Sequence, residues 1–139
     1  MPMESLARVK QEKGVLLSTM QPSEIIQTLK QALATVPNAV GMNNHMGSRL
    51  TQLSLPMSVT MEYLHKRGLY FVDSRTTRFS KAERIATKLG VVNTKRNVFI
   101  DHIVKVAEID LQFHRLLALA KNMDTRWELP TLMLKHSSI

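Results

Sequence analysis

Short apolar segments alternate with longer segments of helical periodicity along this 139-residue chain. Each apolar segment is too short for a helix and is typical of a buried strand. Strands that are apolar throughout, rather than at alternate residues, belong to parallel sheets that are covered on both faces. The segments are residues 15–17, 39–42, 69–72 and 97–100. The sequence therefore predicts an α/β fold of serial βα units with a parallel sheet, in a layered or barrel arrangement.

A helical pattern follows each predicted strand. The first begins at Pro22 and ends before Pro37, and the second ends at Gly68, which is a suitable C-terminal cap. Ser80 and Glu83 have the spacing of a capping box at the start of the third helix. The fourth and longest pattern places Ile103, Val106, Asp110, Phe113, Leu117 and Ala120 on one side of a helix.

The composition fits one folded domain and excludes several classes of protein. Hydrophobic residues make up 44% and charged residues 22% of the chain. No apolar run reaches the ~18–20 residues that a membrane-spanning helix needs, so no membrane span is expected. Cysteine is absent, which excludes disulfide scaffolds and cysteine-ligated zinc sites. Residues 1–13 lack the apolar segment of a secretory signal, so the chain as given is expected to stay in the cytoplasm.

The charge balance raises nucleic acid or an anionic surface as a partner to be considered. Nineteen Lys and Arg against eleven Asp and Glu give a net charge of +8, and phosphate contacts with such a surface release counterions. The basic residues occur singly or in pairs, however, and aromatic residues make up only 5%. A platform for stacking bases is therefore not expected, and a solvated basic surface is favoured over a nucleic-acid footprint. A basic, non-catalytic module that binds nucleic acid or an anionic envelope polymer is the alternative function.

Polar residues cluster directly after the predicted strands. The carboxyl ends of parallel strands lie at one edge of a sheet, and the loops there form ligand sites. The His45 imidazole and the Asp73 and Asp101 carboxylates are groups that bind a divalent metal or transfer protons, whereas Arg49 and Arg75 suit an anionic group. Residues of these types also cap helices and close turns, but no capping role explains a histidine at position 45. The expected substrate-binding residues are Asn43, Asn44, Ser48, Arg49, Ser74 and Arg75.

Three stretches carry a family resemblance. They are residues 36–51 (VPNAVGMNNHMGSRLT), 68–77 (GLYFVDSRTT) and 96–101 (RNVFID). Over about residues 2–120 the chain resembles the divergent polysaccharide deacetylases, bacterial envelope proteins of the glycoside hydrolase/deacetylase β/α-barrel superfamily. The resemblance implies part of a distorted (β/α) barrel, with a polysaccharide or a peptidoglycan-like polymer as substrate. It also implies that intact members are exported to the periplasm or beyond.

By analogy with true deacetylases, the resemblance implies hydrolysis of an N-acetyl or related acyl group by a metal-activated water. A divalent metal such as zinc polarises the acyl carbonyl in that chemistry, and a carboxylate takes the proton. His45 is then the expected metal ligand, and Asp73 and Asp101 are the expected catalytic carboxylates. Arg49 and Arg75 are expected to position the substrate.

The chain departs from the family pattern at both ends. An Asp-Asp motif and a histidine of the family would precede Met1, so a three-ligand metal site is not expected to be complete. We therefore expect residues 1–121 to form a partial barrel with little or no catalysis, or else a remnant that does not fold. Residues 122–139 are an atypical tail. A one-base shift from the Lys121 codon forces two glycines and permits an apolar strand, which favours a frameshift. The oligomeric state is not predicted.

Overall fold

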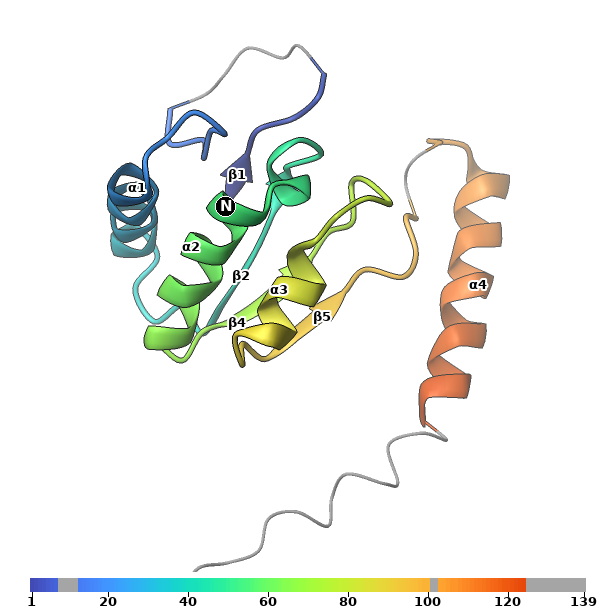
Figure 1. The fold of residues 1–139 in the computed structure, drawn as a ribbon. Helices are drawn as coiled ribbons and strands as arrows, with labels where there is room; N and C mark the ends of the chain where they lie inside the picture. Colours follow the sequence, from blue (N-terminus) through green and yellow to red (C-terminus); the bar gives the residue numbers. More distant parts are fainter. Residues whose placement is uncertain (8–12, 101–102, 125–139) are drawn as a thin grey trace, which may run out of the picture. The chain divides into compact units, whose positions relative to one another are not determined.

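The computed structural model describes residues 1–7, 13–100 and 103–124 (Figure 1). The chain divides into two compact units, Met1–Arg96 and Asn97–Ile139. The elements of the first unit are β1 (Pro2–Met3), α1 (Pro22–Ala34), β2 (Gly41–Asn43), β3 (His45–Met46), the 3-10 helix η1 (Leu50–Gln52), α2 (Ser54–Lys66), β4 (Tyr70–Asp73), α3 (Ala82–Lys88) and β5 (Asn93–Lys95). The second unit contains α4 (Val106–Asp124). Within the described ranges, no helix combines the length and apolar character needed to cross a membrane.

The strand pairs of the first unit are parallel. Strand β4 lies between β2 and β5, with Met42 opposite Phe71. Strand β1 pairs with β3, and a single parallel bridge joins Met3 to Leu16. Only Asn44 separates β2 from β3, so the segment from residue 41 to 46 pairs first with β4 and then with β1. The carboxyl ends of β1, β3 and β4 consequently lie along one edge.

Helices α1, α2 and α3 lie side by side along the strands (Figure 1). Helix α2 packs between α1 and α3, and both α2 and α3 contact β4. Leu29 of α1, Leu64 of α2 and Phe71 of β4 are fully buried in this layer. Tyr70 precedes Phe71 and therefore points to the opposite face, where it is 43% exposed. Parallel strands with helices on one face form the wall of a (β/α) barrel, which confirms the predicted α/β class. The two-sided cover that the apolar strands also suggested is not present among the described elements.

Most of the predicted element positions in the first unit are confirmed. Helix α1 begins at Pro22 and ends before Pro37, and the N–H of Gln21 donates a 2.6 Å hydrogen bond to the Glu24 carboxylate at its start. Helix α2 is followed by Gly68, which has a φ of +64° in the left-handed region that a helix C-terminus favours. Strand β2 begins two residues later than the predicted segment 39–42.

Two predicted strands are wrong. Residues 15–17 contribute only the bridge at Leu16, and residues 97–100 form no strand. The strand that follows α3 is instead β5, whose sequence is Asn-Thr-Lys. Strand β5 has one neighbour among the described strands, and backbone groups make its ladder hydrogen bonds, so its side chains need not be apolar. The apolar pattern therefore predicted a strand at the next apolar run, residues 97–100, in place of β5.

The predicted capping box at Ser80 and Glu83 is also wrong. Helix α3 has Lys81 as its N-cap, which moves Glu83 out of the position that a capping box requires. The Ser80 hydroxyl accepts a 3.2 Å hydrogen bond from the Ala82 N–H, while Glu83 pairs with Lys95. The Ser80 side chain therefore stabilises the loop before α3, and the Glu83 side chain binds the neighbouring strand β5. They do not form the reciprocal side-chain-to-backbone bonds of a capping box.

Helix α4 is described by itself, because it belongs to the second unit. The predicted helical stripe is confirmed only from Val106 onward, because Ile103 precedes the helix. Val106 is 85% and Phe113 47% exposed. The helix continues through Asp124, so residues 122–124 of the predicted tail are helical. The rest of that tail, and with it the frameshift hypothesis, lies outside the described residues.

Candidate functional site

The segment between β2 and β3 is joined to the loop after β4 through Asn44 and Ser74. The N–H of Ser74 donates a 2.8 Å hydrogen bond to Asn44 Oδ1, and the Ser74 hydroxyl donates to the Asn44 carbonyl oxygen. The Asn44 amide nitrogen donates to the Met46 carbonyl at 3.0 Å, and the Asn44 side chain is fully buried. The polar groups of Asn44 therefore hold the segment between β2 and β3 against the loop after β4.

Exposed polar groups surround this junction. Asn43 is exposed, and its amide nitrogen lies 3.5 Å from the Ser74 hydroxyl. The hydroxyl of Thr76 donates a 2.8 Å hydrogen bond to the Met46 carbonyl, which also ties the end of β3 to the loop after β4. His45 belongs to β3, and its side chain is exposed. Asn43, Asn44 and Ser74 are thus brought together as the sequence predicted.

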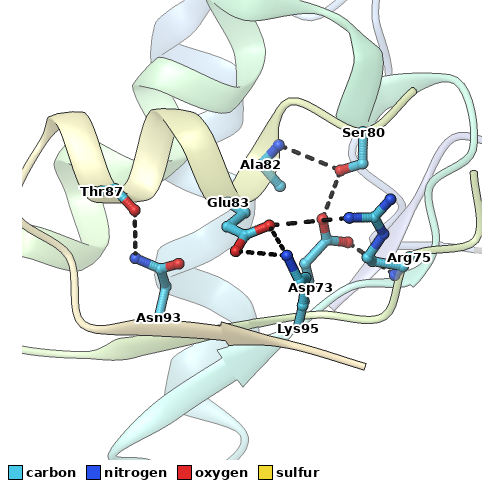
Figure 2. Close-up of polar contacts among 8 residues, drawn as sticks. All are labelled: Asp73, Arg75, Ser80, Ala82, Glu83, Thr87, Asn93 and Lys95. Carbon is cyan, nitrogen blue, oxygen red and sulfur yellow. Dashed lines mark hydrogen bonds and ion pairs between the residues drawn. The ribbon is translucent and has the colours of Figure 1, made fainter. Parts of the chain in front are cut away.

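Asp73 ends β4 and is almost completely buried. Its Oδ1 accepts a 2.8 Å hydrogen bond from the Arg75 N–H, and its Oδ2 accepts a 2.6 Å hydrogen bond from the Ser80 hydroxyl (Figure 2). The Asp73 carbonyl accepts from the Arg96 N–H at 2.8 Å. The carboxylate expected to be catalytic therefore uses both oxygens to shape the loop that follows β4. Asp101, the second expected carboxylate, lies outside the described residues.

An ion cluster lies between α3 and the ends of β4 and β5 (Figure 2). The Lys95 ammonium donates to both carboxylate oxygens of Glu83, at 3.0 and 2.9 Å. The Arg75 guanidinium lies 3.9 Å from the same carboxylate. The Arg96 guanidinium donates a 3.0 Å hydrogen bond to the Arg75 carbonyl. The cations of two strand ends thus converge on one exposed carboxylate.

Ser48 and Arg49 lie against the segment that follows β1 rather than against the β4 loop. The Ser48 hydroxyl is 3.0 Å from the Ser5 hydroxyl. The Arg49 guanidinium is 3.3 Å from the Glu4 carboxylate and is 53% exposed. Glu4 also accepts a 2.6 Å hydrogen bond from the Ser18 N–H. The predicted substrate-binding residues consequently form two neighbouring groups along the same edge.

The two loops contain strained backbone. Met46 and Arg75 have φ values of +56° and +45°, in a region that costs a non-glycine residue about 1–3 kcal/mol. Gly47 has a φ of +86°, and a Cβ on it would lie 3.1 Å from the Met3 Cβ. Such strain is found where a ligand-binding loop is held in one conformation. Its presence in both loops supports a functional role for this edge.

The described residues do not fit a zinc site. A structural or catalytic zinc takes at least three protein ligands, and no group of three His, Asp or Glu side chains within the described ranges is arranged to hold a metal ion. His45 is exposed, and Asp73 is engaged by the loop. A divalent metal bound at this edge would therefore need additional ligands that do not come from the described residues.

A cavity of about 490 Å³ lies between α1 and the strands. Its apolar lining includes Leu33, Val36 and Tyr70, and Asn43 contributes to its rim. The ring of Tyr70 covers the backbone of Gly41, where an added Cβ would lie 2.4 Å from the ring. No sequence pattern indicated this cavity, because it is formed by residues from three separate segments.

Four residues of the site were not predicted: Glu4, Ser80, Glu83 and Lys95. Ser80 and Glu83 were interpreted as a helix cap, and the misplaced fourth strand concealed Lys95. Their proximity to Arg49, Asp73 and Arg75 depends on strand pairing, which spacing along the chain does not reveal. The one available signal was the set of separated charged residues that follows β4, which includes Arg75 and Glu83.

Comparison with known proteins identifies the family. Residues 1–126 match the family model of the divergent polysaccharide deacetylases. The chain belongs to this family. The chain is 40% identical over 121 residues to the uncharacterized protein YibQ of Escherichia coli K12, and 36% identical over 121 residues to an uncharacterized protein of Haemophilus influenzae. Each match covers 87% of the chain but only 38% and 43% of those relatives.

A solved structure shares the fold. The crystal structure of the uncharacterized protein ATU2773 from Agrobacterium tumefaciens C58 superimposes with a TM-score of 0.82 at 24% identity. The superposition covers 87% of this deacetylase-family chain and 50% of that protein. The likeness supports the partial (β/α) barrel.

Proposed function

We propose that the carboxyl-edge loops of this chain bind an acylated sugar polymer, as the substrate-binding part of a polysaccharide deacetylase. Family membership supports the reaction class. The observation that carries the proposal is the pair of Asn44–Ser74 hydrogen bonds, which ties the segment between β2 and β3 to the loop after β4 and so forms one platform. Binding groups held in advance lose less conformational entropy when a ligand binds.

The chemistry of the platform suits a sugar. Asn43 and Arg49 offer exposed hydrogen-bond donors along the edge, and Asn43 also offers an amide oxygen. Sugar hydroxyls and the amide of an N-acetyl group are complementary to such groups. The apolar cavity beside Asn43 suits the apolar part of an acyl group.

The roles proposed for Asp73, Asp101 and His45 rest on different observations. Asp73 is a positioning residue in this account, because it fixes the loop that carries Ser74 and Arg75. Asp101 stays the candidate for taking a proton, and His45 stays the candidate for a first metal ligand. A bound divalent metal would supply Lewis-acid activation of the acyl group. Since the described residues do not complete its ligand set, we propose that the 139-residue chain binds the polymer and hydrolyses it little or not at all.

Isothermal titration of the 139-residue chain with N-acetylchitotetraose and with peptidoglycan oligomers tests the proposal. Asn43→Ala is expected to weaken binding by about ten-fold, as loss of one or two hydrogen bonds would. Gln27→Ala, which removes a similar amide from the exposed side of α1, is the matched control and should leave affinity unchanged. An absence of binding to both sugars, or equal losses in the two variants, would contradict the proposal.

A further inference from the structure

The segment that contains the ion cluster at the ends of β4 and β5 has more positive than negative charge. Residues 73–96 contain seven basic residues and two acidic ones, Asp73 and Glu83. Asp73 is buried and hydrogen-bonded within its own loop. Glu83 is therefore the single exposed carboxylate in this segment, and the Lys95 and Arg75 side chains both approach it.

The cluster is held in place by the backbone. Arg75 has a left-handed φ of +45°, its N–H donates to Asp73, and its carbonyl accepts a hydrogen bond from Arg96. Lys95 ends β5, opposite Asp73 of β4. The two cationic side chains therefore start from fixed points, Arg75 in the loop after β4 and Lys95 at the end of β5, which is how a preformed anion site is built.

The Glu83 carboxylate contacts Lys95 more closely than it contacts Arg75. Lys95 makes two hydrogen bonds to it, whereas the Arg75 guanidinium, at 3.9 Å, is beyond hydrogen-bonding distance. The side chains of Arg75, Lys95 and Glu83 are 35%, 38% and 40% exposed. Solvent, and hence a ligand, can reach all three groups.

We propose that Arg75 and Lys95 bind a carboxylate of the polymer, and that Glu83 occupies this position in the free protein. The inference rests on the proposed function and narrows its substrate class to a sugar polymer that carries carboxylate groups. A carboxylate already lies between the two cations, so a ligand carboxylate would reproduce contacts that the site makes. The Arg75 guanidinium adds a planar fork that matches a carboxylate in bidentate fashion.

The test compares oligogalacturonate, which carries a carboxylate on each sugar, with N-acetylchito-oligosaccharide of the same length, which is neutral. Titrations of the 139-residue chain are made at one fixed ionic strength, since exposed charges are screened by salt. The expected result is tighter binding of the carboxylated oligomer. Arg75→Gln and Lys95→Gln should each weaken that binding by about five- to ten-fold, and Glu83→Gln should tighten it several-fold because the competing carboxylate is gone.

Two controls separate this site from general charge effects. Lys88→Gln, at the exposed carboxyl end of α3, removes the same charge as Lys95→Gln. Glu62→Gln, on the exposed side of α2, removes the same charge as Glu83→Gln. Both controls should change the affinity by less than about two-fold, as distant exposed charges do. Arg75→Lys, which keeps the charge without the fork, should have an intermediate affinity, and circular dichroism confirms that each variant is folded.

Several outcomes would overturn the inference. They are equal affinity for the two oligomers, the same loss in Lys88→Gln as in Lys95→Gln, weaker binding by Glu83→Gln, or tighter binding of inorganic phosphate or duplex DNA through Arg75 and Lys95. Neutral sugar binding that depends on Asn43 but shows no carboxylate preference would leave the proposed function standing without this inference. Carboxylate binding that depends on Arg75, without any binding of acylated sugars, would support the carboxylate site but contradict the proposed function.

Discussion

The hydroxyl of Ser80 donates a 2.6 Å hydrogen bond to Oδ2 of the buried Asp73, and this joins the segment before α3 to the end of β4. The N–H of Arg75 occupies the other carboxylate oxygen at 2.8 Å. The loop between β4 and α3 is therefore closed around one carboxylate. This closure sets the positions of Ser74, which contacts Asn44, and of Arg75, which faces Glu83.

Replacing Ser80 with alanine should destabilise the fold by about 1–3 kcal/mol, because a buried carboxylate oxygen would lose its hydrogen bond. Urea unfolding followed by circular dichroism measures the change. Ser23→Ala, at an exposed position in the first turn of α1, is the control and should change the free energy of unfolding by less than about 0.5 kcal/mol. Equal stabilities for the two variants would mean that the Ser80–Asp73 contact contributes nothing.

Gly47 and Gly14 offer a matched pair, since both have a φ of +86°. An alanine at Gly14 would meet no atom within 4 Å, whereas its Cβ at Gly47 would lie 3.1 Å from the Met3 Cβ. Gly14→Ala should cost about 1 kcal/mol from the left-handed backbone alone. Gly47→Ala should cost about 1–3 kcal/mol more, from overpacking. Thermal unfolding of both variants checks the order, and a Gly14→Ala variant as unstable as Gly47→Ala would contradict the packing around Met3.

Tyr63 is 8% exposed, and its hydroxyl has no hydrogen-bond partner within the described part of the chain. Tyr63→Phe should therefore be neutral or stabilise the fold by up to about 1 kcal/mol, because it removes an unpaired buried polar group. Tyr70 is 43% exposed on the face of the sheet opposite the helices, and Tyr70→Phe should leave the free energy of unfolding unchanged. A loss of more than about 1 kcal/mol in Tyr63→Phe, measured by urea unfolding, would show that this hydroxyl has a partner.

Calorimetric titration with zinc should give no tight 1:1 binding by the 139-residue chain. The reason is the lack of three convergent donors within the described residues. His45→Ala should leave the titration unchanged. Stoichiometric binding that His45→Ala abolishes would instead show that donors outside those residues, such as Asp101, complete a site.

The sequence predicted the buried elements well. The strand at Tyr70–Asp73 and the helix at Ser54–Lys66 carry side chains that are buried, such as Phe71 and Leu64, so their apolar patterns report the packing directly. Strand β5 escaped prediction because its pairing with β4 depends on backbone hydrogen bonds and not on its polar side chains.

The sequence predicted that Asn43, Asn44 and Ser74 lie together at one edge, which the structure shows, but it could not assign roles to these residues. Asp73 was expected to be catalytic, yet both its oxygens are used by the loop. The Glu83–Lys95 pair joins α3 to β5, two elements whose proximity is a product of the sheet. Residue type and spacing indicate which groups gather, whereas tertiary contacts decide which groups stay available for a ligand.

The location of sugar binding tests the account most directly. In a ¹H–¹⁵N NMR titration of the 139-residue chain with N-acetylchitotetraose, the largest chemical-shift changes should fall on the backbone amides of residues 43–49 and 74–76. Amides of α2 should change little. Shift changes confined to residues 103–124, or no changes at saturating sugar, would contradict a polymer-binding role for the loops that Asn44 and Ser74 join.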